Sequence, residues 1–300
     1  MFTWLRRQIR PAAVFLILLI ALFLTGCGNG SRPASAGTEG QIVVKVLDIG
    51  QGEAILVRAG GQITLIDTGD TPTKERLAAL LSKEGVTTLD RLILTHPHSD
   101  HIGGAATVLE RFPVSQVYDS GQTTTTATYR KYMETVGKKK VPLALLAAGD
   151  VIDLGGGAKL KVFAPQKPFL TGDSGQPDLN NNSIVAKLIY GSFSMLLTGD
   201  AEKESELQMV KNNGSELKSS VLKVGHHGSS TSSSPELLKV AAAEAAIISL
   251  GEGNEYRHPH PVTLKKLESR KYKIYRTDRN GTVTVTSDGK TYTVGKEKEL

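Results

Sequence analysis

The chain has 300 residues, of which 39% are hydrophobic and 22% are charged. This length and balance suffice for one large or two ordinary globular domains with a buried core, and they exclude a wholly disordered chain. The formal net charge of +6 is modestly basic, which allows a polyanionic partner such as nucleic acid or teichoic acid without requiring one.

The N-terminal segment is typical of a bacterial secretory signal. Arg6, Arg7 and Arg10 precede an apolar run over residues 12–24 that is too short to span a bilayer comfortably. The three arginines would leave with the signal, so the mature chain would keep a net charge of about +3.

The apolar run ends in a Leu-Thr-Gly-Cys sequence that resembles the lipobox of bacterial lipoproteins, and its Cys27 is the only cysteine in the chain. We therefore expect residues 1–26 to be a lipoprotein signal peptide. Lipidated Cys27 would anchor the protein to the outer face of the cytoplasmic membrane. An uncleaved anchor helix and a free thiol without a role are the alternatives.

The composition then changes twice along the chain. Residues 27–40 are rich in Gly, Ser, Ala, Pro and Thr, which indicates a flexible tether, and residues 41–300 form the expected folded domain. Strands are predicted over residues 42–47, 53–57, 62–66, 91–94, 114–118, 159–163, 183–190, 192–197, 220–224, 246–250, 282–286 and 291–294. Helices are predicted between Thr73 and Gly85 and over residues 103–111, 128–136, 202–211, 235–242 and 262–269. Such alternating groups suit two sheets stacked face to face with helices outside.

The decisive stretch is THPHSDHIGG at residues 95–104, between a predicted buried strand and a predicted helix. Three imidazoles and one carboxylate within six positions offer nitrogen and oxygen donors that suit divalent metals. In an extended segment His96 and His98 point the same way and can share one metal, while Asp100 and His101 can face a second. A chance histidine cluster or a purification tag would lack both the aspartate and the preceding apolar strand.

This stretch is similar to the His-x-His-x-Asp-His signature of the metallo-β-lactamase superfamily. Further segments resemble, in the right order, signatures of the branch found in ComEC-type competence proteins: LDIGQGEA at 47–54, LIDTG at 65–69, LLTGD at 196–200, KVGHHGS at 223–229 and Asn254-x-Tyr256-x-His258-Pro259. The resemblance covers residues 41–294. It implies an α/β fold in which two mixed β-sheets form a four-layer αββα sandwich.

The resemblance also implies a site for two divalent metal ions. The expected ligands are His96, His98, Asp100, His101, Asp200 and His226. Asp200 is expected to bridge the two ions. His226 is preferred to His227 as ligand, because adjacent residues at a strand end face opposite ways.

Other matched residues receive supporting or catalytic roles from the same resemblance. Asp100, His227 and His258 are the expected catalytic residues, with His227 contacting substrate phosphate or shuttling a proton. Asp67 is expected to support the histidine loop by hydrogen bonding without touching metal. For His258, an ordinary loop position before a proline is an equally weighted reading.

One departure from better-known β-lactamases concerns the first metal. No histidine lies between His101 and His226, where those enzymes supply a third histidine to that ion. The segment Asn180-Asn181-Asn182-Ser183 occupies the corresponding stretch, so Asn182 is expected to offer an amide oxygen or a bond to the bound water. Asn182, Ser183 and Ser229 are the expected substrate contacts. Fewer nitrogen donors make the site harder in character, so Mn²⁺ rivals Zn²⁺.

Two metal ions can share a hydroxide as nucleophile and neutralise charge on a phosphoryl group. The leading hypothesis is therefore a phosphodiesterase or nuclease that acts on DNA or another phosphodiester polymer outside the cytoplasmic membrane. The alternatives are a lactonase or β-lactamase-type hydrolase and a non-catalytic metal-binding surface lipoprotein. The expected partners are the substrate and the membrane, and no protein partner is predicted.

Overall fold

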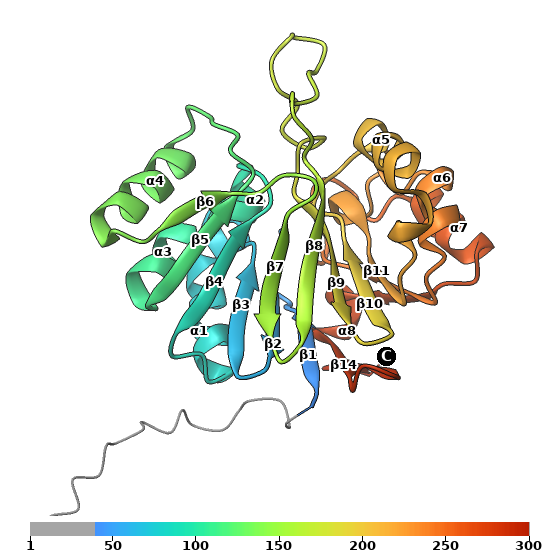
Figure 1. Cartoon of the computed structure of the whole chain (residues 1–300), viewed down its shortest axis with the longest axis horizontal. Helices are drawn as coiled ribbons and strands as arrows, with labels where there is room; N and C mark the ends of the chain where they lie inside the picture. Colours follow the sequence, from blue (N-terminus) through green and yellow to red (C-terminus); the bar gives the residue numbers. More distant parts are fainter. Residues whose placement is uncertain (1–39, 300) are drawn as a thin grey trace, which may run out of the picture. The chain divides into compact units, whose positions relative to one another are not determined.

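Two β-sheets packed face to face, with helices on both outer sides, organise the computed structural model (Figure 1). It describes residues 40–299. The predicted signal peptide, Cys27 and all of the predicted tether except Gly40 lie outside the described residues.

The eight-stranded sheet combines antiparallel and parallel strands. Its spatial order is β15-β14-β1-β2-β3-β4-β5-β6, and pairing is parallel from β3 to β6 and antiparallel elsewhere. The strands are β1 (Ile42–Val46), β2 (Ile55–Ala59), β3 (Gln62–Ile66), β4 (Leu89–Leu94), β5 (Val114–Asp119), β6 (Leu143–Leu145), β14 (Val283–Ser287) and β15 (Tyr292–Lys296).

The seven-stranded sheet is mixed in the same way. Its order is β13-β12-β11-β10-β9-β8-β7, and β10 to β13 are parallel. The strands are β7 (Val151–Gly155), β8 (Ala158–Ala164), β9 (Val185–Tyr190), β10 (Phe193–Leu197), β11 (Val221–Lys223), β12 (Ala245–Ile248) and β13 (Lys273–Arg276).

The helices cover the outer faces of the two sheets. In Figure 1, α1, α3 and α4 flank one sheet, and α5, α6 and α7 flank the other. The α-helices are α1 (Lys74–Lys83), α2 (Ser99–Ile102), α3 (Ala105–Arg111), α4 (Ala127–Lys139), α5 (Lys203–Asn213), α6 (Pro235–Ala241), α7 (Pro261–Ser269) and α8 (Thr277–Asn280), and the 3₁₀ turns are η1 (Thr71–Thr73), η2 (Gly214–Leu217) and η3 (Gly225–Gly228). Among residues 40–299, no helix is both long and apolar enough to cross a membrane.

Three apolar layers hold this arrangement together, and strand alternation explains them. On β4, Ile93 faces the layer between the sheets, whereas Leu92 faces the helices α1, α3 and α4. On β10, Met195 packs between the sheets and Leu196 packs against α5 and α6. Each sheet is therefore apolar on both faces, which requires four layers. The predicted four-layer αββα sandwich of two mixed sheets is confirmed.

The prediction missed three short strands. β6 and β13 have three and four residues, and β7 alternates exposed and buried positions beside a run of glycines. All three lie at sheet edges, where one neighbour is missing and the strand needs less apolar surface.

Candidate metal centre

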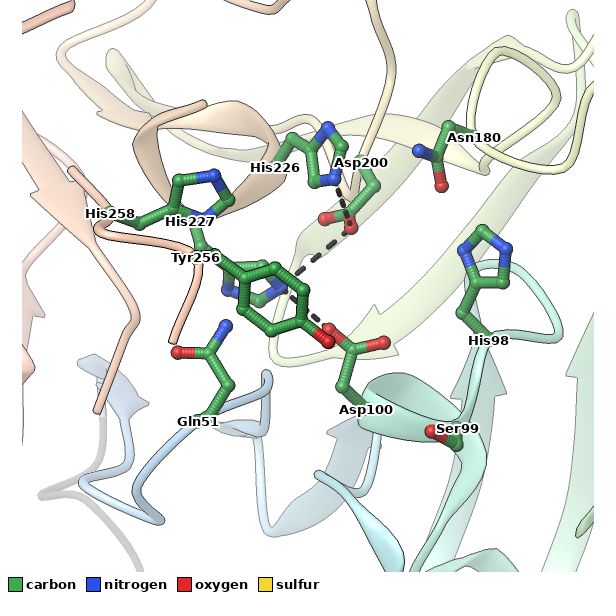
Figure 2. Close-up of a pocket in the computed structure, with 10 residues that line it drawn as sticks. All are labelled: Gln51, His98, Ser99, Asp100, Asn180, Asp200, His226, His227, Tyr256 and His258. Atoms are coloured by element: carbon green, nitrogen blue, oxygen red, sulfur yellow. Dashed lines mark ion pairs between the residues drawn. The ribbon is translucent and has the colours of Figure 1, made fainter. Parts of the chain in front are cut away.

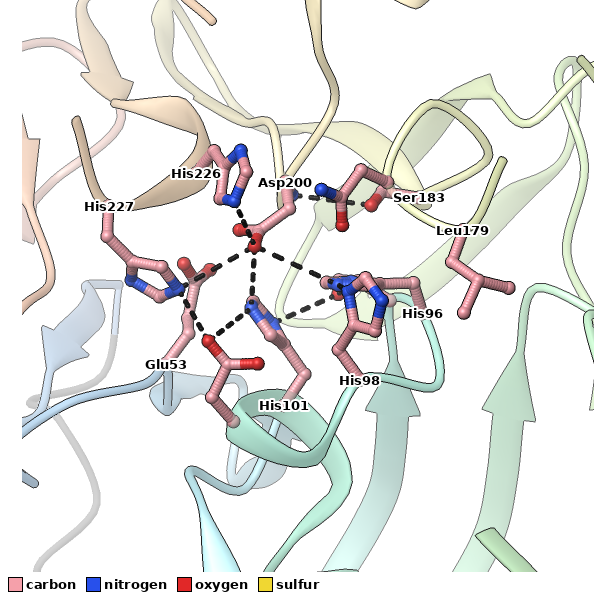
Figure 3. A network of polar contacts seen from close by, with 12 residues as sticks. Glu53, His96, His98, His101, Leu179, Ser183, Asp200, His226 and His227 are labelled. Atoms are coloured by element: carbon pink, nitrogen blue, oxygen red, sulfur yellow. Dashed lines mark hydrogen bonds and ion pairs between the residues drawn. The ribbon is translucent and has the colours of Figure 1, made fainter. Parts of the chain in front are cut away.

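The chemically distinctive side chains follow the carboxyl ends of parallel strands from both sheets. The histidine loop follows β4 at Leu94, Asp200 follows β10 at Leu197, and the His226-His227 pair follows β11 at Lys223. Ligand sites of open α/β sheets lie at such strand ends. Figure 3 shows the side chains converging from the two sheets on one point.

Asp100, His101, Asp200 and His227 form the tightest group. One possible ligand atom from each lies within 4.8 Å of the others. Nε2 of His101 is 3.2 Å from Oδ2 of Asp200, and Nε2 of His227 is 3.2 Å from Oδ2 of Asp100. We call these four residues the Asp/His cluster.

His96 and His98 form a second donor group beside it. Nε2 of His96 is 3.0 Å from Nδ1 of His98 and 3.8 Å from Oδ2 of Asp200. Oδ2 of Asp200 therefore lies near imidazole nitrogens of both donor groups, those of His96 and His101. This is the position from which one carboxylate can contact two cations.

The cluster has the unsatisfied donor set that a divalent cation requires. Nε2 of His101, Nε2 of His227 and Oδ1 of Asp200 are buried and make no hydrogen bond within the described part of the chain. Buried polar atoms are normally paired, and imidazole nitrogens with carboxylate oxygens are ordinary ligands of Zn²⁺. The residues therefore fit a metal ion.

Protonation in the cluster is strongly coupled to its charges. Burial alone would lower the pKa of His101, but the carboxylates of Asp200, Asp67 and Asp100 raise it well above the ordinary value. Burial would raise the pKa of Asp200, yet His101 and His227 hold it well below its usual range. A cation bound between these groups would take the place of the imidazole protons.

Two hydrogen bonds turn the cluster imidazoles toward its centre. Nδ1 of His101 donates to Oδ2 of Asp67 at 2.7 Å, and Nδ1 of His227 donates to the carbonyl of Ser249 at 2.8 Å. A proton held on Nδ1 leaves the lone pair on Nε2 facing the other ligands. Asp67 is fully buried, and its carboxylate also accepts hydrogen bonds from the backbone N–H and the hydroxyl of Thr95.

The two adjacent histidines after β11 take different places. Both have left-handed backbone conformations, with φ of 49° and 52°. His227 is buried in the Asp/His cluster, whereas His226 is 23% exposed and lines the pocket beside it. Nδ1 of His226 lies 3.0 Å from Oε1 of Glu202. His227 thus belongs to the Asp/His cluster, while Nε2 of His226, the ligand expected from sequence, lies 3.8 Å from Oδ2 of Asp200, against 3.7 Å for His227.

A pocket of about 270 Å³ opens above the cluster (Figure 2). Its lining residues are Gln51, His98, Ser99, Asp100, Asn180, Asp200, His226, His227, Tyr256 and His258. Gln51, Ser99, Asn180 and Tyr256 had no role assigned from sequence. Gln51, Ser99 and Tyr256 belong to the motif segments already quoted, which is the only signal that could have identified them.

Rings stack from the cluster toward the mouth of the pocket. The His258 ring lies 6.4 Å from that of His227 with an interplanar angle of 20°, and Tyr256 lies 5.7 Å from His258 at 24°. Tyr256 is 53% exposed. Burial and the neighbouring imidazoles lower the pKa of His258 to about 4, so its ring is neutral at pH 7.

The predicted hydroxyl and amide contacts, Asn182, Ser183 and Ser229, are not among the residues that line this pocket. The Asn182 side chain bonds to the backbones of Leu170 and Asp178 and holds the β8–β9 connection, while Asn180 lines the pocket instead. Ser183 Oγ accepts from the backbone N–H of Asp200 at 3.3 Å. Ser229 Oγ lies 3.0 Å from Thr231 Oγ1 and is not among the lining residues.

Comparisons with known proteins agree with this geometry. Residues 47–252 match the model of the family described as the metallo-beta-lactamase superfamily. The chain is 34% identical over 258 residues to ComE operon protein 3 of Bacillus subtilis (80% of this chain, 32% of that protein). It is 31% identical over 274 residues to competence protein ComA of Neisseria gonorrhoeae (91% and 35%). The chain thus spans about a third of the length of these relatives.

The fold also matches solved structures. The metallo-beta-lactamase fold protein YhfI from Bacillus subtilis superimposes with a TM-score of 0.50 at 13% identity, over 79% of this chain and 95% of that one. At this identity the likeness concerns the fold alone. The family match and the buried Asp/His cluster together show that the chain belongs to the metallo-β-lactamase superfamily, whose competence-protein members it resembles in sequence.

Proposed function

We propose that this protein is a metal-dependent phosphodiesterase that cleaves DNA or another phosphodiester polymer outside the cytoplasmic membrane. The observation that carries the proposal is that Oδ2 of Asp200 lies near imidazole nitrogens of both His96 and His101, and that Asp200 lines an open pocket. Two divalent cations held there would supply a nucleophilic water at neutral pH and neutralise the charge of a phosphoryl group.

Each donor group would hold one ion. His96, His98 and Asp200 would bind the first, with Zn²⁺ or Mn²⁺ as candidates. The Asp/His cluster, which includes Asp200, would bind the second. Asn180 lines the pocket, and its Oδ1 is buried without a hydrogen bond among the described residues. Asn180 would therefore supply the amide oxygen that the sequence predicted for Asn182.

The remaining pocket residues would act on the substrate. Glu202 fixes Nδ1 of His226, so that Nε2, 3.8 Å from Oδ2 of Asp200, is presented at the pocket. This nitrogen can hold a proton close to a leaving oxygen. His258, neutral at pH 7, can accept a hydrogen bond or stack without adding charge.

DNA is the preferred polymer for two reasons. One relative is named a competence protein, and the exposed Tyr256 ring at the pocket mouth offers a face on which a base can stack. A β-lactamase or lactonase remains the second candidate class, because the superfamily match alone does not select the substrate.

One assay compares these candidates. The purified protein, supplied with Zn²⁺ or Mn²⁺, is offered bis-p-nitrophenyl phosphate, single-stranded and duplex DNA, and nitrocefin. We expect phosphodiester turnover that is lost in Asp100→Ala and kept in Asp150→Ala, an exposed aspartate outside the pocket. Turnover of nitrocefin alone would favour the lactamase class. Turnover of none would favour a non-catalytic metal-binding protein.

We further propose that Cys27 carries a lipid that anchors the protein to the outer face of the membrane. The support is the Leu-Thr-Gly-Cys sequence that follows the apolar run. Cells grown with a labelled fatty acid should label the wild-type protein and not Cys27→Ser. Equal labelling of both would reject the anchor.

A further inference from the structure

A fully buried ion pair lies beneath the metal centre. Nζ of Lys223 contacts Oε2 of Glu53, and the side chains are 0% and 1% exposed. Lys223 ends β11 in the seven-stranded sheet, while Glu53 lies in the β1–β2 connection of the eight-stranded sheet. The pair therefore joins the two sheets. In Figure 3 the Glu53 side chain rises from its loop toward the Asp/His cluster.

Stability alone gives little reason for such a pair. Removing a lysine and a carboxylate from water is costly, and well-packed apolar residues in the same place are often as stable or more so. Oε1 of Glu53 is also buried without a hydrogen bond among residues 40–299. These costs point to a role in positioning.

On one side, Glu53 holds the loop that carries Asp100 and His101. Its backbone N–H donates to the carbonyl of Asp100 at 3.1 Å, and its carbonyl accepts from Gly69 at 2.8 Å. The backbone N–H of Thr68, the residue before Gly69, donates to the carbonyl of His101 at 2.7 Å. The backbone at Gly52 lies close to the histidine loop: a Cβ atom at Gly52 would stand 2.5 Å from the Asp100 carbonyl oxygen.

On the other side, Lys223 holds the segments that carry Asp200 and His227. Its carbonyl accepts from the hydroxyl of Thr198 at 2.7 Å, two residues before Asp200. Its Nζ also donates to the carbonyl of Val224 at 3.0 Å, three residues before His227.

Ser249 provides a second connection between the two sheets. The Ser249 carbonyl accepts from Nδ1 of His227, and the Ser249 hydroxyl donates to the carbonyl of Gly52 at 2.8 Å. Glu53 and its neighbour Gly52 are thus tied to ligands from both sheets.

We propose that the Glu53–Lys223 pair is a clamp that sets the spacing between the two halves of the Asp/His cluster. Asp100 and His101 come from the eight-stranded sheet, and Asp200 and His227 come from the seven-stranded one. Both residues act through the ligands they position. The inference rests on the metal site of the proposed function and is independent of the substrate.

The test measures Co²⁺ binding to the full chain by titration of its visible absorption, which reports ligand geometry, together with thermal unfolding. The variants are Glu53→Gln, Lys223→Met and the double variant. Glu216→Gln is the control, because its pair with Lys161 is exposed. We expect each clamp variant to weaken one of the two Co²⁺ equivalents by about 10- to 100-fold and to change its spectrum, while the control binds as wild type.

The double variant separates positioning from folding. Each single variant leaves one charge buried and unpaired and should unfold at a lower temperature, whereas the double variant should recover thermal stability without recovering Co²⁺ affinity. A stable double variant that binds both equivalents with wild-type affinity and spectrum would overturn the clamp alone. A wild-type protein that binds no Co²⁺ would overturn the metal site and the clamp together.

Discussion

Replacing Asp67 with Asn should weaken metal binding without removing any ligand. Asp67 accepts three hydrogen bonds of 2.7 Å, from the backbone N–H of Thr95, the Thr95 hydroxyl and Nδ1 of His101. An asparagine has one accepting oxygen and one donating NH₂ group in place of the two carboxylate oxygens. It cannot satisfy the Thr95 N–H on one side and the His101 N–H on the other.

The two possible orientations of the amide each carry a penalty. If the NH₂ group faces His101, the imidazole proton must move to Nε2, and the ring no longer offers a lone pair to metal. If the NH₂ group faces the Thr95 N–H, two buried donors oppose each other, at a cost of about 1–3 kcal/mol. Metal binding requires the second orientation. The dissociation constant should therefore rise by roughly 5- to 150-fold, since about 1.4 kcal/mol corresponds to a factor of ten.

A competition titration of Zn²⁺ against a chromophoric chelator measures this change. Asp153→Asn is the matched control, because Asp153 is exposed and also accepts a backbone N–H, from Gly155. If Asp67→Asn binds Zn²⁺ within twofold of wild type, the reasoning that Asp67 sets the tautomer of His101 is refuted.

Three further predictions concern the cluster and the pocket. His227→Ala should lose one equivalent of bound metal by elemental analysis, and His226→Ala should keep both; equal losses would contradict the separate places of the two rings. Carboxylates raise the pKa of His101 well above 6.5, so its protonated form stabilises the metal-free protein fully below pH 6.5, and that contribution is lost as the pH rises through the raised pKa. Zn²⁺ must displace this proton, so adding Zn²⁺ should raise the melting temperature of the protein more at pH 8 than at pH 6. A Zn²⁺-induced rise that does not depend on pH would argue against competition between Zn²⁺ and the His101 proton. Tyr256→Ala should raise KM for single-stranded DNA by about 5- to 150-fold, from a stacking energy of about 1–3 kcal/mol. Tyr256→Phe should leave this KM unchanged, and Tyr256→Ala should leave turnover of bis-p-nitrophenyl phosphate unchanged; an equal loss on both substrates would exclude base stacking.

Local sequence patterns predicted where the histidine loop and Asp200 lie relative to the strands. The apolar run of β4 ends just before the histidine loop, and β10 ends just before the Thr-Gly-Asp turn that carries Asp200. Since strand ends are visible in hydrophobic patterning, both positions could be assigned from sequence. The four layers follow from strands that are apolar on both faces.

Which of His226 and His227 joins the buried Asp/His cluster could not be predicted in this way. The alternation rule assumes an extended backbone, but both residues have positive φ within a 3₁₀ turn. The choice between Asn180 and Asn182 depends likewise on a loop conformation, in which Asn182 is engaged by the backbone of Leu170. The Glu53–Lys223 pair joins positions far apart in the chain, and no local pattern signals it.

The pairing of β1 with β14 bears on how the protein reaches its folded state. Ile42 lies opposite Ser287, so the first strand cannot complete its hydrogen-bonded ladder until almost the whole described chain has been synthesised. Contacts between such distant segments slow folding. The eight-stranded sheet consequently stays incomplete beside β1 until β14 and β15 are available to close it.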